Sequence, residues 1–169
     1  MILLCYGTRP EWIKIKPLIK AFEGKIPFRV LFTGQHADIS GGWFHDKLKI
    51  TEGVNRLDSI ISSVMNNINF KDVTAVLSMG DTVTSFAVAL TAFNHKVPVI
   101  HLEAGLRTYN LNHPYPEEGY RQMTSRITDI HLCPTTTAKT HLLRDSVGGE
   151  IYVVGNTVLD NLVGIESSY

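Results

Sequence analysis

Short runs of apolar residues alternate with longer amphipathic stretches along this chain, and no other feature of the sequence constrains the fold as strongly. The short runs are apolar throughout instead of at every second position, which is typical of strands buried on both faces. They cover residues 1–7, 28–34, 73–80, 97–103, 130–134 and 150–156. Because such strands alternate with helices, the sequence predicts the α/β fold class, with a doubly wound parallel sheet between two layers of helices.

The helical spacing of apolar residues predicts the elements between these strands. The expected helices cover residues 9–22, 117–129 and 136–145, with another around residues 83–90 and a last stretch from Thr157. Residues 41–70 are less regular: Trp43, Phe44 and Leu48 suggest a short helix, and residues 57–68 a second one. No internal linker or repeat interrupts the pattern, so we expect one domain.

The balance of charge argues against several classes of partner. Sixteen Lys and Arg residues balance sixteen Asp and Glu residues without a basic run, so we expect no nucleic-acid and no membrane partner. No apolar run approaches the roughly 20 residues that a membrane span needs. Met1 leads straight into the first strand without a basic region or cleavage site. We therefore expect no signal peptide and a cytoplasmic location.

Metal and cofactor sites also lack their usual signatures. The seven histidines show no zinc-ligand spacing, and we expect His101 to pack on its strand. Cys5 and Cys133 lie in apolar, strand-like contexts without C-x-x-C spacing, so both thiols are expected to be free and buried. Neither a P-loop nor a G-x-G-x-x-G motif is present, so the usual sequence signatures of ATP and NAD sites are absent. We expect no metal and no cofactor.

The first of three loops with candidate site residues is "GTRPEWIK", residues 7–14. Thr8 and Glu11 have the spacing of a capping box, in which each side chain binds the other residue's backbone N–H at a helix start. Arg9 and Lys14 then lie near the positive end of that helix, which suits a phosphate or diphosphate. The alternative is plain helix capping, with both cations in solvent.

The second and third loops place acids where strands end. Asp81 follows the strand 73–80 and is either a site residue or the N-cap of the next helix. Glu103 ends the strand 97–103, and a partly desolvated carboxylate there needs a partner. Arg107 is the nearest candidate, so a structural ion pair between Glu103 and Arg107 is the alternative to a site role.

A further acid pair, Glu117 and Glu118, begins the helix 117–129, where the helix dipole alone favours negative charge. Even so, Asp81, Glu103 and Glu117 all fall where the carboxyl ends of parallel strands meet, at the edge where such sheets bind ligands. Several carboxylates there suit proton transfer more than nucleophilic catalysis, because no G-x-S-x-G or Cys–His signature appears. His36 lies in a loop at the same edge and is a candidate substrate contact.

A set of motifs spread from Met1 to about Asp160 resembles the N-terminal half of the non-hydrolysing UDP-N-acetylglucosamine 2-epimerases. The motifs occur in the family's order: "GTRPEWIKIKPLI", "TGQH", "GDTVTS", "HLEAGLRT", "PEE" followed by Arg121, "CPT" and "VVGNTVLD". The resemblance implies a Rossmann-like domain over residues 1–160, one half of a glycosyltransferase-B-type architecture. It also implies that residues 161–169 begin the connection to a second such domain, which this chain does not include.

The family interconverts UDP-GlcNAc and UDP-ManNAc by eliminating UDP to a glycal-type intermediate and adding it back after protonation at C2 from the other face. The resemblance implies that the acidic active-site positions are Asp81, Glu103 and Glu117. It implies Arg9 and Lys14 as substrate-contacting cations, and we add Arg107 and His36 as further candidate contacts. Our hypothesis is that Asp81 and Glu117 transfer protons, while Glu103 orients the sugar.

The expected partners are a UDP-sugar and a second Rossmann-like domain, in the same chain or a separate one, with a homodimer also possible. Residues 38–47 depart from the family's commoner continuation after "TGQH", where effector residues lie in some members, so allosteric control is not expected. Because half a cleft cannot position the substrate, we expect little turnover by this chain alone. The alternatives are a non-catalytic binding or assembly module and half of a related glycosyltransferase.

Overall fold

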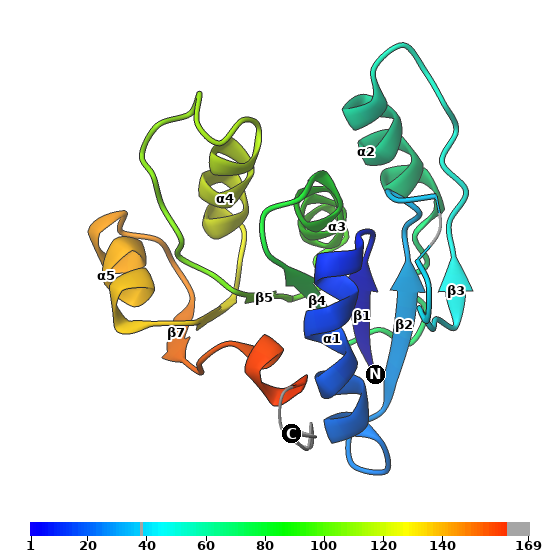
Figure 1. Cartoon of the computed structure of the whole chain (residues 1–169), viewed down its shortest axis with the longest axis horizontal. Coiled ribbons are helices and arrows are strands. Elements are labelled where there is room, and N and C mark those ends of the chain that lie inside the picture. Colours follow the sequence, from blue (N-terminus) through cyan, green and yellow to red (C-terminus); the bar gives the residue numbers. More distant parts are fainter. Residues whose placement is uncertain (38, 162–169) are drawn as a thin grey trace, which may run out of the picture.

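The computed structural model describes residues 1–37 and 39–161, and Figure 1 shows the arrangement of their helices and strands. The segment 161–169, expected to begin a connection to a second domain, lies outside this part except for the backbone of Asn161. The strands are β1 (Ile2–Tyr6), β2 (Phe28–Phe32), β3 (Asp46–Lys47), β4 (Ala75–Met79), β5 (Val99–Leu102), β6 (Ile130–Cys133) and β7 (Glu150–Val153). The helices are α1 (Arg9–Phe22), α2 (Arg56–Asn67), α3 (Val83–Asn94), α4 (Glu117–Arg126), α5 (Thr136–Arg144) and the 3-10 helix η1 (Thr157–Asn161).

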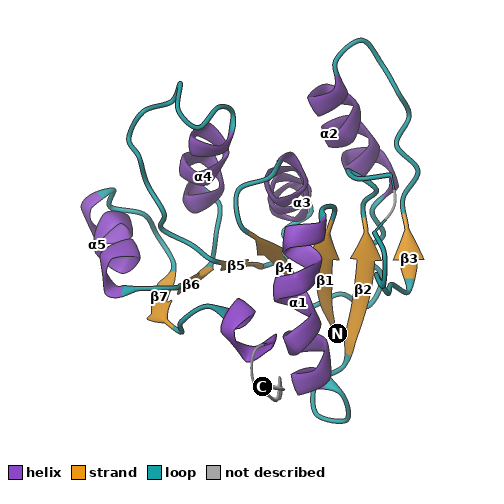
Figure 2. Ribbon diagram, viewed as in Figure 1, coloured by secondary structure: helices purple, strands orange, loops and turns teal. Residues whose placement is uncertain are grey.

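The described strands form one parallel sheet in the order β3-β2-β1-β4-β5-β6-β7, which confirms the predicted fold class. Helix α1 covers one face of the sheet, and α2, α3 and α4 cover the other (Figure 2). Along β1, Leu3 and Cys5 pack under α2 and α3, whereas Leu4 and Tyr6 pack under α1. Because both faces of β1 are buried, its sequence is apolar at every position.

The direction in which the sheet is built reverses between β1 and β4. From β1 the chain moves outward to β2 and β3, then returns to β4 and proceeds through β5, β6 and β7 in the other direction. The connections that leave β1 and β4 therefore diverge to opposite faces, and a crevice opens above the carboxyl ends of these two strands. In open α/β sheets ligands bind at this switch point.

The short helix expected around residues 43–48 was wrong, because this segment is not helical and contains the edge strand β3 at Asp46–Lys47. Its backbone N–H groups bind β2 instead of an intrahelical carbonyl: the N–H of His45 donates to Val30 O at 2.9 Å. The ring of Phe44 also stacks on Phe32, with 5.6 Å between their centroids. Sheet pairing and aromatic contact thus outweigh the helical spacing, whereas α2 confirms the second helix expected in this region.

The two cysteines and His101 lie buried in the interior of the sheet, as the sequence predicts. Cys5 and Cys133 are both buried and free, as expected. His101 is buried opposite His131 on the neighbouring strand, and its Nε2 lies 2.7 Å from Gly80 O. Burial lowers the pKa of His101 to about 4, so the neutral form predominates at neutral pH. No described helix is both long enough and apolar enough to cross a bilayer.

Candidate functional site

The connection after β1 is organised by the predicted capping box. Thr8 Oγ1 accepts the Glu11 N–H, and Glu11 Oε2 accepts the N–H groups of Thr8 (2.8 Å) and Gly7 (2.7 Å). These contacts fix the first turn of α1 against the end of β1. Lys14, one turn further along, is thereby held above the sheet edge.

Lys14 forms an ion pair with Glu103, the acid at the end of β5. Its Nζ lies 2.7 Å from both carboxylate oxygens, and both side chains are partly buried. Glu103 has a φ of +63°, a left-handed conformation that is uncommon for a residue with a side chain. This turn directs the carboxylate toward α1, so the alternative pair of Glu103 with Arg107 was wrong.

The guanidinium of Arg107 is directed to other groups. Its Nε donates to Asp145 Oδ2 and its Nη2 to Ser125 Oγ, each at 2.8 Å, and its side chain is only 1% exposed. Arg107 therefore joins the connection after β5 to α4 and α5. This burial separates it from the solvent-accessible surface on which its expected substrate contact depends.

Asp81 forms an ion pair with Arg121, which lies on a helix that is distant in the sequence. Arg121 of α4 donates to Asp81 Oδ2 through both Nε (2.9 Å) and Nη2 (2.5 Å), and to Glu118 Oε2 through Nη1 (3.2 Å). The residue that caps α3 is Thr82, whose hydroxyl accepts the Ser85 N–H at 3.1 Å, so the N-cap alternative for Asp81 was wrong. Asp81 instead faces the crevice at the carboxyl ends of the strands.

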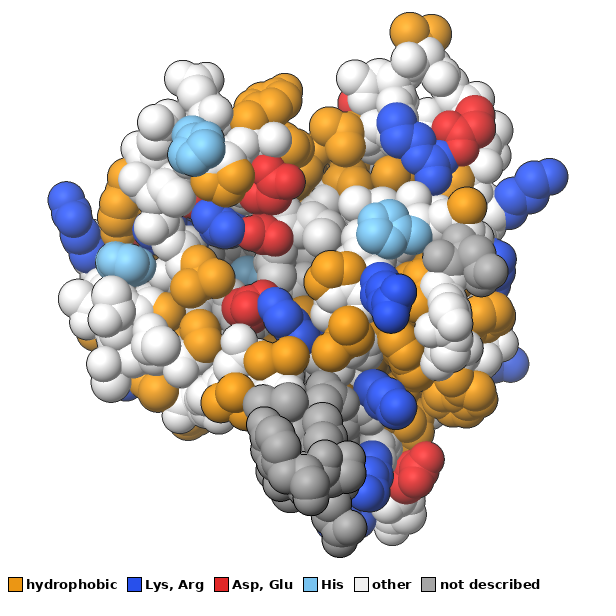
Figure 3. Space-filling view, viewed as in Figure 1, with side chains coloured by type: hydrophobic (Ala, Val, Ile, Leu, Met, Phe, Trp, Pro, Cys, Tyr) orange, Lys and Arg blue, Asp and Glu red, His pale blue; other side chains and the backbone are white. Residues whose placement is uncertain are grey.

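A cavity of about 220 Å³ lies at the switch point between β1 and β4. Its lining comes from the start of α1 with the residue before it, the end of β4 with the residues after it, one residue after β2 and one after β5: Thr8, Pro10, Glu11, Lys14, His36, Met79, Gly80, Asp81, Thr82 and Glu103. Acidic and basic side chains adjoin one another in the middle of this face of the molecule (Figure 3). A complete small-molecule site usually encloses roughly 300–1,000 Å³, so this cavity is the size of part of one.

A narrow crevice adjoins this cavity on the other side of the Lys14–Glu103 ion pair. It is lined by those two side chains and by Leu102, Pro134, Gly155, Asn156 and Thr157. Thr157 Oγ1 also donates to Lys14 O at 2.8 Å, which fixes η1 beside α1. The crevice brings the "CPT" and "GNT" motifs to the same edge as the acids.

The structure brings four of the seven predicted site residues to one cavity: Lys14, His36, Asp81 and Glu103. Arg9 is exposed beside it, and its backbone N–H donates to His36 Nδ1 at 3.4 Å. Glu117 begins α4 as predicted and is half-buried, but it is not among the cavity's lining residues.

Three polar groups at this edge were not predicted as site residues: Arg121, Glu118 and the hydroxyl of Thr82. Glu118 is fully buried, and its carboxylate accepts the backbone N–H groups of Thr108 and Tyr109, each at 3.0 Å. The motif "PEE" with Arg121 signals that this part of α4 matters. No spacing in the sequence, however, shows that Arg121 reaches the connection after β4.

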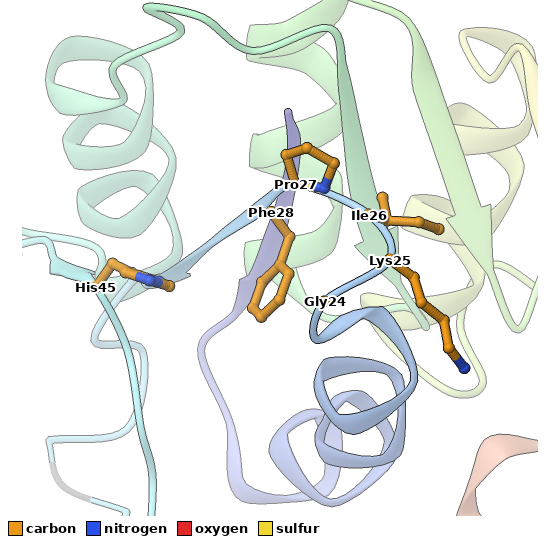
Figure 4. Close-up of a pocket in the computed structure, with 6 residues that line it drawn as sticks. All are labelled: Gly24, Lys25, Ile26, Pro27, Phe28 and His45. Carbon is orange, nitrogen blue, oxygen red and sulfur yellow. The ribbon is translucent and has the colours of Figure 1, made fainter.

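Another cavity, of about 390 Å³, lies at the amino end of β2 (Figure 4). Its lining consists of residues 24–28 and His45, and it contains no carboxylate. The ring of His45 meets Phe28 edge-on, with 6.0 Å between centroids. Because it lies at the opposite end of the strands from the acids, this cavity offers no group for proton transfer near a bound anion.

Known proteins resemble this chain in sequence over nearly its whole length. A family model described as UDP-N-acetylglucosamine 2-epimerase matches residues 20–168. The UDP-N-acetylglucosamine 2-epimerase of Salmonella borreze is 40% identical, and the match covers 98% of this chain and 48% of that protein. That of Neisseria meningitidis is 38% identical, with 96% and 47% covered. The chain thus spans about half the length of the curated relatives it matches.

Solved structures show the same likeness. A Neisseria meningitidis UDP-GlcNAc 2-epimerase bound to UDP-GlcNAc superposes with a TM-score of 0.88 at 37% identity, covering 96% of this chain and 48% of that one. The UDP-GlcNAc 2-epimerase of Methanocaldococcus jannaschii superposes with a TM-score of 0.83 at 32% identity, covering 96% and 47%. The described fold is therefore the fold of about half of each enzyme.

Proposed function

Because the chain belongs to the UDP-N-acetylglucosamine 2-epimerase family, we propose that it supplies the N-terminal half of an active site that interconverts UDP-GlcNAc and UDP-ManNAc. The observation that carries this proposal is that Asp81, Glu103 and Lys14 line one cavity at the switch point of the sheet. A relative crystallised with UDP-GlcNAc supports the choice of substrate.

The reaction requires groups that this edge offers. Removing the C2 proton while UDP leaves C1 forms a C1–C2 double bond, and returning a proton to the other face of C2 while UDP adds back gives the epimer. We assign the proton transfers to Asp81 and Glu117, and the orientation of the sugar to Glu103. Arg9 and Lys14 would stabilise the charge of the departing diphosphate.

The size of the cavity supports a two-part site. At about 220 Å³, it can enclose only part of a UDP-sugar. A second Rossmann-like domain, in the same chain or in a separate one, would supply the opposite wall. A homodimer and a cytoplasmic location stay predictions from the sequence.

Binding of UDP-GlcNAc to this chain tests the proposed function. We expect weak but measurable binding in a ligand-observed NMR titration, weakened at least about tenfold by Arg9→Ala, because a charged contact to the diphosphate is lost. Lys20→Ala is the matched control: it removes an exposed cation from the last turn of the same helix and should leave binding unchanged. Absent binding, or binding insensitive to Arg9→Ala, would favour a non-catalytic assembly module.

The assignment of Glu117 is tested by hydrogen exchange at C2. In a complex with a second domain that restores turnover, Glu117→Gln should slow incorporation of solvent deuterium at C2 at least about a hundredfold, because a positioned acid–base group is lost. Glu52→Gln, an exposed acid paired with Arg56 on α2, is the control and should exchange normally. Exchange at the unaltered rate in Glu117→Gln would reassign the proton transfer to another group.

A further inference from the structure

Glu11 is a buried carboxylate in the floor of the cavity. It is only 4% exposed and lies among the lining residues with Asp81 and Glu103. Unlike those two acids, Glu11 has no cationic partner among the described residues and is held by hydrogen bonds alone. Burial raises its pKa, opposed by the hydrogen bonds that it accepts from Thr82, Gly7 and Thr8. A buried group without an ion partner needs another explanation for its presence.

The hydrogen bonds of Glu11 divide between two connections of the sheet. Its Oε2 accepts the Gly7 and Thr8 N–H groups and the Thr8 hydroxyl (3.0 Å), all in the connection after β1. Its Oε1 accepts the hydroxyl of Thr82, at 2.5 Å, in the connection after β4. An ordinary capping box needs only the first set, so the bond to Thr82 is an additional link across the switch point.

Thr82 connects this link to the site. It follows Asp81 directly and caps α3 through the Ser85 N–H, so a bond that holds Thr82 also fixes the backbone next to Asp81. On the other side, Glu11 lies in the same first turns of α1 as Arg9 and Lys14. The bond from Thr82 to Glu11 therefore joins the segment with the diphosphate-binding cations to the segment with an acid that faces the sugar.

We infer that Glu11 is a positioning residue that aligns Asp81 with Arg9 and Lys14 by holding Thr82 across the switch point. The inference rests on the proposed function and deepens it. Glu11 touches no reacting atom in this scheme; it sets the spacing between the sugar-binding and the diphosphate-binding parts of the cavity. Losing the link should therefore weaken recognition of the sugar while leaving recognition of the diphosphate intact.

The test compares the affinities for UDP and UDP-GlcNAc in NMR titrations of the chain. Glu11→Ala would also leave the backbone N–H groups of Gly7 and Thr8 without acceptors, and this loss can unfold the chain. The hydrogen bond is therefore removed by substituting Thr82 instead. In the unaltered chain we expect UDP-GlcNAc to bind at least about tenfold more tightly than UDP. Thr82→Val should lower the affinity for UDP-GlcNAc to that for UDP and leave the affinity for UDP unchanged. Thr82→Ser, which keeps the hydroxyl, should keep the full ratio between the two affinities.

Two controls separate positioning from other effects. Asn55→Ala removes the cap of α2, distant in the chain from this link, and should leave both affinities unchanged, which accounts for loss of a cap alone. In the Thr82→Val background, Glu11→Gln should lower neither affinity further, because Glu11 is then already uncoupled from Asp81. An additional loss of either affinity there would show that Glu11 acts on the ligand by a route other than Thr82 and would overturn the inference.

The remaining outcomes distinguish the inference from the proposed function. An unaltered chain that prefers UDP-GlcNAc, with the same preference in Thr82→Val, overturns the role of Glu11 and leaves the proposed function standing. An unaltered chain that binds neither ligand, or both equally, overturns the sugar-binding half of the proposed function and the inference with it.

Discussion

The substitution Gly105→Ala is expected to destabilise the chain by about 3–5 kcal/mol, a large part of the 5–15 kcal/mol that stabilises a typical domain. Gly105 lies in the connection after β5 with a φ of +85°, a conformation that costs a residue with a Cβ about 1–2 kcal/mol. The added Cβ would also overlap the carbonyl oxygen of Ala138 and lie 3.1 Å from Leu142 Cγ. Since Ala138 and Leu142 are buried in α5, relief requires the helix to move away from the sheet.

Gly24→Ala provides the matched control for this effect. Gly24 also has a positive φ, of +69°, but its Cβ position has no other atom within 4 Å. It should therefore show the backbone cost alone, about 1–2 kcal/mol. Urea unfolding followed by circular dichroism measures both variants. Equal losses in the two would mean that α5 yields without cost and that the close approach at Gly105 is unimportant.

The substitution Glu118→Ala should cost about 3–5 kcal/mol, because it breaks a buried ion pair and strands the donors around it. The carboxylate accepts the N–H groups of Thr108 and Tyr109, Gln122 Nε2 at 2.9 Å and Arg121 Nη1 at 3.2 Å. Without it, two backbone donors lose their partners. Urea unfolding at neutral pH measures the loss, and Glu52→Ala, which removes an exposed acid, should cost less than about 1 kcal/mol.

The pH dependence of stability, compared between the unaltered chain and Glu118→Gln, provides a second test of the role of this carboxylate. Burial raises the pKa of Glu118, but the hydrogen bonds from Gln122, Thr108, Tyr109 and Arg121 lower this pKa by more than burial raises it. The pKa of Glu118 therefore lies below the ordinary value of 4.5. A carboxyl whose folded pKa is depressed stabilises the fold fully above its unfolded pKa and loses that contribution as the pH falls through the folded pKa. The difference in unfolding free energy between the unaltered chain and Glu118→Gln should thus shrink on acidification below about pH 4. A difference that is constant with pH would contradict an ionised, hydrogen-bonded Glu118.

The fold was largely predictable because its strands are buried on both faces. The central strands read as predominantly apolar runs, as Leu3 to Tyr6 illustrate, and such runs separated by amphipathic helices admit few arrangements. The strand β3 was missed because it has two residues and is held by contacts with β2 that no local pattern reveals. Short edge strands depend on neighbours that are distant in the sequence.

The location of the candidate site was also predictable, but its ion pairs were not. Asp81 and Glu103 follow strands that are neighbours in the sheet, and the topology alone brings their connections together. The choice of partner depends on the direction of each side chain. The left-handed turn at Glu103 directs it to Lys14, 89 residues earlier, and α4 directs Arg121 to Asp81, 40 residues earlier. Sequence proximity favoured Arg107 for Glu103, whereas backbone geometry decides otherwise.

The ion pairs of Lys14 with Glu103 and of Arg121 with Asp81 affect how an anionic molecule would reach this edge. Asp81 and Glu103 each have a cation 2.5–2.7 Å away, so these two carboxylates repel an approaching anion little at a distance. The chain as a whole has a net charge of zero and adds no attraction of its own. Under the proposed function, a nucleotide sugar would therefore receive little long-range electrostatic guidance and would be retained by local contacts, so its rate of encounter should depend little on ionic strength.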